Sequence, residues 1–249
     1  MNRKYNNYKI NKIHNKLKKP NTNTSSDDDE YEYLMEDFGD KNIYIKDNNI
    51  FFYTDVSVDS CLTLSKYITQ LTENSLIMSI KMNISPPPIY LHIQSDGGNP
   101  IPAFNIIDQI QHNKVPIISI IEGSAASAAT LISVVCHERR ITKNSLMLIH
   151  QMSVSVEGTM ERVIDEYISN EKIALAMKKI YQTKTKITDS QIEDILKRDI
   201  WWTSLECFEY GLVDIIDNMT KEEINKEIKQ NKPKKEEIYK DIKNNKPNK

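Results

Sequence analysis

The stretch from Gly123 to Thr130 consists only of small residues, and Ser127 lies within it with no bulky side chain beside it. An apolar run typical of a buried strand precedes this stretch, and a helix-like run overlaps its end. A serine at such a junction lies near a helix N-terminus, where the dipole favours negative charge and small neighbours let a ligand approach. This arrangement suits a nucleophilic serine. It also suits plain close packing of a helix against a strand.

A serine nucleophile needs a base, a carboxylate that orients the base, and N–H donors for the oxyanion. Among the five histidines, His150 ends an apolar strand-like run, from which a side chain leaves the core and can enter a cleft. Asp199 lies just past a predicted helix. His150 also fits a strand-end histidine that hydrogen-bonds only to backbone. The residues therefore allow a serine hydrolase without requiring one.

The segments that would position these residues alternate between strand-like and helix-like patterns. Helices are expected over Val58 to Leu71, Ala103 to Ile110 and Ala128 to Cys136. The expected strands are Asn49 to Tyr53, Ile89 to Ile93, Val115 to Ile121 and Leu146 to Ile149. This order predicts an α/β fold with parallel strands joined by crossover helices. Ligands bind such sheets at the carboxyl ends of strands, where the pair Gly97-Gly98 and the residue Gly123 fall.

The later part of the chain is predicted to be mostly helical. A long helix is expected from Thr159 to about Tyr181, and a helix of that length can project and pack against another subunit. Capping boxes at Thr188 to Gln191 and at Thr203 to Glu206 predict two more helices. A final strand is expected over Leu212 to Ile216.

Composition limits the function classes. The 249 residues include 39% hydrophobic residues and carry a net charge of −2, which allows a sizeable core and gives no strong attraction to nucleic acid. No apolar run approaches the roughly 20 residues of a membrane span, so no membrane insertion is expected. The three cysteines are far apart, which indicates unpaired core thiols in a reducing compartment. We expect no metal and no cofactor.

Both ends of the chain differ from its middle. The composition of residues 1–40 indicates a disordered or poorly ordered Asn/Lys-rich tail, and residues 219–249 indicate a charged tail with a short amphipathic helix as the alternative. The folded domain is therefore expected over residues 41–218. No apolar secretory segment is present, so a cytoplasmic location is expected, with organelle targeting by the basic N-terminal residues as the alternative.

Four motifs, in this order, resemble the proteolytic subunit of the Clp protease family. They are Gly123-Ser124-Ala125-Ala126-Ser127, Leu148-Ile149-His150-Gln151, Lys197-Arg198-Asp199 and Glu209-Tyr210-Gly211-Leu212-Val213-Asp214, with the Gly97-Gly98 turn ahead of them. Each motif alone is weak, but four in order with matching separations are specific. The resemblance runs from about Asn49 to Ile216.

The resemblance implies a serine endopeptidase with the crotonase-like fold, which repeats strand-strand-helix units and projects a long helix used in ring stacking. It implies Ser127 as the nucleophile, His150 as the general base and Asp199 as the carboxylate that holds the imidazole. The N–H groups of Gly97 and Ala128 would form the oxyanion hole. The implied assembly is a homo-oligomer, a tetradecamer of stacked heptameric rings, that hydrolyses polypeptide substrates fed by an ATP-driven (AAA+) unfoldase.

The sequence also departs from the family pattern. Asp96 stands where the family usually has Pro, and Ala128-Ala129 stand where it usually has Met-Gly. A carboxylate near the oxyanion hole opposes the developing charge, so a slower peptidase is expected. Residues 31–48 show no clear match to the family segment that contacts the unfoldase, which leaves that coupling open. One alternative is a ring-assembly subunit of low intrinsic activity that co-assembles with a related peptidase chain. Another is a crotonase-fold enzyme acting on acyl-CoA, which typically uses glutamates as acid and base; a Ser-His-Asp set with no matching pair of glutamates argues against it.

Overall fold

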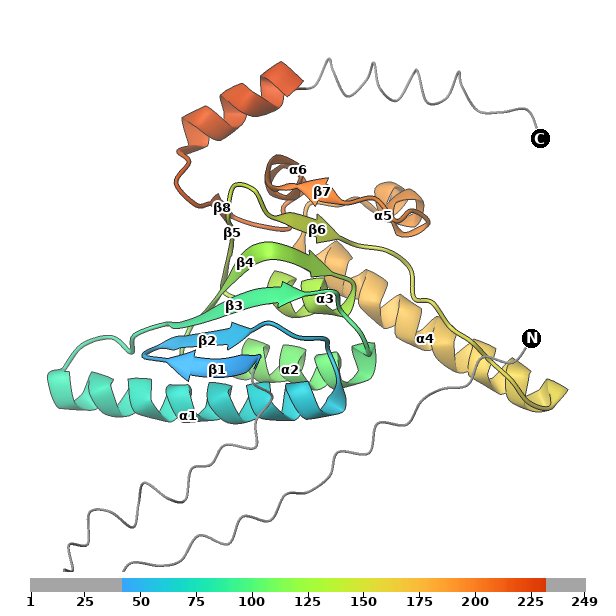
Figure 1. Cartoon of the computed structure of the whole chain (residues 1–249), viewed down its shortest axis with the longest axis horizontal. Coiled ribbons are helices and arrows are strands. Elements are labelled where there is room, and N and C mark those ends of the chain that lie inside the picture. The colour runs from blue at the N-terminus through green and yellow to red at the C-terminus, as the bar shows by residue number, and fades with distance from the viewer. Residues whose placement is uncertain (1–41, 232–249) are drawn as a thin grey trace, which may run out of the picture. The chain divides into compact units, whose positions relative to one another are not determined.

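The computed structural model describes residues 42–231, and the predicted N-terminal tail over 1–40 lies outside the described residues, as do residues 232–249. The described chain forms an eight-stranded sheet with helices packed against it (Figure 1). The strands are β1 (Ile43–Lys46), β2 (Asn49–Phe52), β3 (Ile89–Ser95), β4 (Ile117–Ala126), β5 (Glu138–Ile141), β6 (Leu146–Leu148), β7 (Trp202–Thr203) and β8 (Ile215–Ile216). The helices with assigned bounds are α1 (Val58–Met82), α2 (Pro100–His112), α3 (Ala128–Val134), α4 (Met160–Lys184), α5 (Asp189–Leu196) and α6 (Ser204–Glu209).

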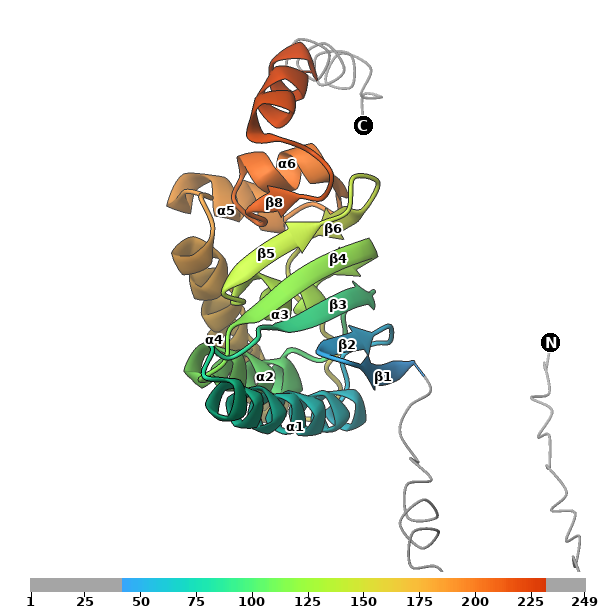
Figure 2. The same cartoon turned by 90° about the vertical axis from the view of Figure 1, so that its left-hand side faces the viewer.

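The centre of the sheet is parallel, as the alternation of strands and helices predicted. Strands β2, β3, β4 and β5 pair in parallel in that order, with β1 antiparallel at one edge and β8 parallel beyond β5. Helices α1, α2 and α3 lie on one face of these strands (Figure 2). The predicted α/β class is therefore confirmed.

Strand β4 is longer than expected and divides between two partners. Residues Ile118 to Ile121 pair with β5, whereas Ser124 to Ala126 pair with β6. The first half of the small-residue stretch, Gly123 to Ala126, is therefore strand, and the helix begins at Ala128 as predicted. The chain consequently turns from β4 into α3 within a single residue, Ser127.

Helix α4 begins one residue after its N-cap Thr159, in agreement with the predicted start, and its buried residues are Met177 and Tyr181. The N-terminal half instead exposes large apolar side chains, namely Met160, Ile164, Tyr167 and Ile168. In Figure 1 this half extends away from the sheet. An exposed apolar helix face of this kind fits a contact with another subunit, which stays a prediction.

The C-terminal elements follow local capping signals. Thr188 and Thr203 each form the predicted capping box, with Gln191 and Glu206 respectively, and these boxes start α5 and α6. Beyond residue 218, a helical stretch covers 221–231, and Ile224 within it is 1% exposed and belongs to the core. The packed part of the chain therefore continues past the boundary expected at 218.

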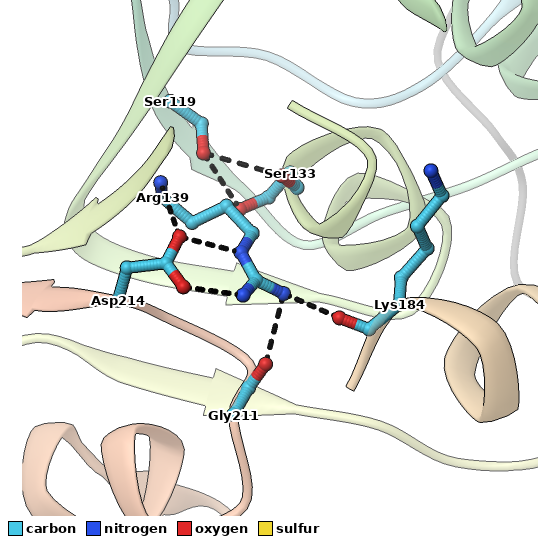
Figure 3. Close-up of polar contacts among 6 residues, drawn as sticks. All are labelled: Ser119, Ser133, Arg139, Lys184, Gly211 and Asp214. Carbon is cyan, nitrogen blue, oxygen red and sulfur yellow. Dashed lines mark hydrogen bonds and ion pairs between the residues drawn. The ribbon is translucent and has the colours of Figure 1, made fainter. Parts of the chain in front are cut away.

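The Arg139 side chain joins β5 to the last residue of α4 and to the segment after α6 (Figure 3). Its guanidinium donates to both carboxylate oxygens of Asp214, at 2.8 Å to Oδ2 and 2.5 Å to Oδ1. It also donates to the carbonyls of Lys184 and Gly211. Partial burial raises the pKa of Asp214, but the hydrogen bonds and charge of Arg139 outweigh burial and leave that pKa below its ordinary value. Arg139 therefore ties the C-terminal elements to the sheet.

Candidate active site

Ser127 has a backbone conformation that is rare for a residue with a side chain, with φ 51° and ψ −122°. Its N–H donates to the Leu148 carbonyl at 2.8 Å. Its carbonyl accepts from Thr130 twice, from the N–H at 3.0 Å and from the hydroxyl at 2.7 Å. Strained backbone costs roughly 1–3 kcal/mol and persists where such contacts hold it, most often at active sites.

His150 follows β6 and Asp199 follows α5, and their side chains meet. His150 Nδ1 lies 2.7 Å from Asp199 Oδ1. The adjoining backbone is joined as well, because the Gln151 N–H donates to the Leu196 carbonyl at 2.7 Å. With Nδ1 held by the carboxylate, Nε2 is the ring nitrogen that can take a proton from a nucleophile. The structure thus brings together two residues that are far apart in the sequence.

The pairing of β4 with β6 brings Ser127 next to the strand that leads into His150. Leu148, which accepts the Ser127 N–H, lies two residues before His150. The Ser127 hydroxyl makes no hydrogen bond within residues 42–231, either to the His150 ring or to another group. Contacts between nucleophile and base are often long in free enzymes and shorten when substrate binds. The backbone segments are therefore assembled, while the serine–histidine hydrogen bond is not formed in this state.

Gly97 packs directly against the serine turn, with a left-handed φ of +91°. A Cβ atom at this position would lie 2.5 Å from the Ala126 carbonyl oxygen, 2.8 Å from Ser127 Cβ and 3.1 Å from the Ala128 nitrogen. Only glycine avoids those contacts and accepts this φ without strain. Gly97 and Ala128, predicted together, therefore lie together beside Ser127.

The amide groups around Ser127 differ in whether they already have an acceptor. Ala128 is the first residue of α3, so its N–H has no carbonyl partner within the helix. The Gly97 N–H donates to Ser95 Oγ at 3.1 Å, whereas the Gly98 N–H has no acceptor in the described part of the chain. Of the two adjacent glycines, Gly98 is thus the one with a free donor. The sequence shows the glycine pair but not the direction of either amide.

The remaining candidate features lie outside this group. A shallow surface pocket of about 410 Å³ is lined by residues that include Arg139, Lys184 and Asp214, and none of the predicted site residues lines it. Between residues 42 and 231, no group of three or more His, Cys, Asp or Glu side chains is placed to hold a metal ion. No helix in the same range is long and apolar enough to cross a bilayer.

Comparison with known proteins places the chain in one protease family. A family model described as Clp protease matches residues 43–220. Over 161 residues the chain is 29% identical to the ATP-dependent Clp protease proteolytic subunit 2 of Treponema denticola, and the aligned region covers 64% of this chain and 80% of that protein. Over 171 residues it is 30% identical to the ATP-dependent Clp protease proteolytic subunit 3 of a Synechococcus species, and the aligned region covers 65% of this chain and 84% of that protein.

Proposed function

The chain belongs to the Clp protease family, and on that premise we propose that it is a serine-type endopeptidase subunit that cleaves polypeptides. In this proposal Ser127 is the nucleophile, His150 the general base and Asp199 the carboxylate that orients the imidazole. The observation that carries it is the 2.7 Å contact of His150 with Asp199, made beside the strained turn at Ser127.

The reaction follows from these roles. Ser127 Oγ attacks the scissile carbonyl carbon while His150 Nε2 accepts its proton, and the imidazolium that forms is stabilised by Asp199. The tetrahedral intermediate expels the amine, which takes the proton from His150 and leaves an acyl-enzyme. Water then attacks the acyl carbonyl with His150 again as the base, which releases the carboxylic acid and restores Ser127.

Two backbone amides are available for the oxyanion. Among residues 42–231 the Ala128 N–H at the start of α3 has no acceptor, and helix N-termini favour negative charge. We propose that the second donor is the Gly98 N–H, rather than the Gly97 N–H, because Gly97 already donates to Ser95 Oγ. The role of Gly97 is then steric: because it has no side chain, the segment after β3 and the serine turn can approach one another closely. Removal of one oxyanion donor typically lowers kcat about 10²–10³-fold.

We further propose that the subunit works in an oligomer, as stacked heptameric rings that enclose the site. The exposed apolar half of α4, from Met160 to Ile168, supports such a contact. The relatives named above are subunits of ATP-dependent proteases, and this chain would owe any ATP dependence to an unfoldase partner. The chamber and that partner would select unfolded polypeptides as substrates.

A ring-assembly subunit of low intrinsic activity is the second candidate. Two observations favour it, namely the absent hydrogen bond between Ser127 and His150 and the 79% exposure of the Asp199 side chain. Water competes for an exposed carboxylate and weakens its hold on the imidazole. In this candidate the chain would support the activity of a related subunit in a mixed ring.

A fluorophosphonate probe separates the two candidates. Ser127 Oγ would attack phosphorus, fluoride would leave, and His150 would take the serine proton. We expect labelling of the purified, assembled protein at Ser127, lost in Ser127→Ala and kept in the matched variant Ser124→Ala. Peptide hydrolysis should fall about 10²–10⁴-fold in Asp199→Asn, because the amide no longer selects the reactive tautomer. Labelling at Ser124, or no labelling of the assembled particle, contradicts the peptidase assignment, and activity only in mixed rings supports the second candidate.

A further inference from the structure

A buried pair of hydroxyl groups connects α4 to the backbone of Ser127. The Tyr181 hydroxyl lies 2.7 Å from Thr130 Oγ1, and Thr130 Oγ1 lies 2.7 Å from the Ser127 carbonyl oxygen. Tyr181 and Thr130 are both 0% exposed. Neither side chain belongs to the proposed triad or to the oxyanion hole. The two hydroxyls therefore link the long helix to the turn that carries the nucleophile.

The direction of the two hydrogen bonds follows from the atoms. The Ser127 carbonyl can only accept, so the single hydroxyl proton of Thr130 is directed to it. Tyr181 must then donate its own proton to Thr130 Oγ1. Burial raises the pKa of Tyr181, with a smaller opposing effect of the Thr130 hydrogen bond, so the phenol stays protonated at any working pH. Tyr181 is consequently a permanent donor to this chain of hydrogen bonds.

The Ser127 carbonyl and the Ala128 N–H belong to one planar peptide group. In a trans peptide the C=O and N–H bonds point in opposite directions, so fixing the carbonyl also fixes the direction of the N–H. Hydrogen bonds to a carbonyl also polarise the attached amide, which strengthens its N–H as a donor. A group that holds the Ser127 carbonyl thus aims and strengthens the Ala128 N–H.

We propose that Thr130 and Tyr181 are positioning residues, which hold the Ser127–Ala128 peptide so that the Ala128 N–H faces the oxyanion. This inference rests on the proposed function, because it takes Ser127 as the nucleophile.

Packing alone does not require these two hydroxyls. The Thr130 N–H already satisfies the Ser127 carbonyl at 3.0 Å, so the Thr130 hydroxyl is not needed to avoid an unpaired acceptor. Replacing both members of a buried hydrogen-bonded pair by apolar groups of the same shape is often close to neutral for stability. A peptide group held at φ 51° without glycine, however, benefits from every contact that opposes its rotation.

The test compares Thr130→Val with Thr130→Ser, since valine keeps the volume and serine keeps the hydroxyl. We expect kcat for peptide hydrolysis, and the rate of fluorophosphonate labelling, to fall about tenfold in Thr130→Val with KM unchanged, and to recover in Thr130→Ser. The midpoint of the pH–rate profile should not move, because His150 and Asp199 are untouched. Tyr181→Phe should give a smaller loss of kcat, and adding it to Thr130→Val should cause little further loss.

Ser133→Ala is the matched control. Ser133 lies in the same helix, is 0% exposed and shares a hydrogen bond with Ser119 at 3.2 Å, with no link to Ser127 (Figure 3). We expect this variant to lose some thermal stability and to keep its kcat per assembled particle. If Thr130→Val fails to assemble, Tyr181→Phe is used instead to test the positioning roles, since it removes only the buried oxygen.

The outcomes separate this inference from the proposed function. If Thr130→Val keeps the wild-type kcat and labelling rate, the positioning roles are overturned; where Thr130→Val does not assemble, the same result in Tyr181→Phe overturns them. The proposed function still holds in that case, provided that Ser127→Ala abolishes labelling. Labelling of Ser127→Ala at the wild-type rate instead overturns the proposed function, and the positioning roles with it. An equal loss of kcat in Ser133→Ala and Thr130→Val assigns the effect to general loosening of α3 and also overturns the inference.

Discussion

Replacement of Gly97 by alanine tests the arrangement around Ser127 most directly. The added Cβ would lie 2.5 Å from the Ala126 carbonyl oxygen. Real Cβ atoms essentially never approach another atom within 3.0 Å and make ordinary contacts from 3.4 Å, so the two atoms must separate by about 0.5–0.9 Å. The nearest atom belongs to the backbone of Ala126, so the backbone itself, and not the end of a flexible side chain, would have to move. Since a displacement of about 1 Å in an active site can lower the rate about 10²-fold, we expect a loss of that size in kcat/KM.

Gly123→Ala is the control for the backbone strain alone. Gly123 also has a positive φ, +68°, but the three atoms nearest to a Cβ there all belong to the Gln94 side chain, at 3.3 Å and beyond. An alanine in left-handed conformation costs roughly 1–2 kcal/mol, so both variants should lose that much free energy of unfolding or more. We expect Gly123→Ala to keep its activity within about twofold, because Gln94 is exposed and can move aside.

The assay pairs denaturant unfolding of each variant with steady-state hydrolysis of a fluorogenic peptide by the assembled protein. Labelling with the phosphonate probe counts the competent sites and corrects for any unfolded fraction. If Gly97→Ala folds and turns over peptide as fast as Gly123→Ala, the close approach of Gly97 to Ser127 is not part of the working site, and this reasoning is refuted.

Three further predictions concern charge and cysteine. Asp96 is exposed next to Gly97, so its charge opposes the developing oxyanion. Asp96→Pro removes that charge and should raise kcat/KM about fivefold at low salt and by less at high salt, where the charge is screened. Unchanged or lower activity would contradict this prediction. Because the pKa of Asp214 lies below its ordinary value, the pair with Arg139 stabilises the fold above about pH 4, and that contribution is lost as the pH falls further. Urea unfolding should therefore show Arg139→Gln to be less stable than wild type at pH 7, by roughly 2–4 kcal/mol, and the difference should narrow near pH 2–3. Burial raises the pKa of the Cys136 thiol to about 12, so a thiol reagent should leave the native protein unlabelled and modify it only after unfolding; rapid native labelling would show that the core opens. The thiols concerned are Cys61, Cys136 and Cys207, all buried.

Local signals in the sequence predicted the elements that depend on near neighbours. The capping boxes of Thr188 and Thr203 form as expected, since each needs only residues three positions apart. Apolar runs and their alternation predicted the parallel centre of the sheet. Strand β5 gave no such signal, because its sequence Glu-Arg-Arg-Ile has no apolar pattern and becomes strand by pairing with β4 and β8.

The candidate site divides in the same way. Residue types and strand-end positions made Ser127 and His150 candidates, but they left plain packing roles open. The resemblance of four ordered motifs to the Clp protease family implied Asp199 as the carboxylate and gave each of the three residues its role. The sequence also indicated that glycine was needed next to them. It did not indicate that the Gly97 N–H would donate to Ser95 Oγ while the Gly98 N–H has no acceptor within residues 42–231.

By itself, the sequence determined the α/β class and the capped helices, and it named a candidate serine, histidine and aspartate. Tertiary structure decided the rest: the one-residue turn from β4 to α3, the contact of His150 with Asp199, and the link from Tyr181 to Thr130. The physical reason is the separation along the chain over which each interaction acts. Helix caps and apolar periodicity act over a few residues, whereas hydrogen bonds across 49 and 51 positions exist only after the sheet and helices have packed.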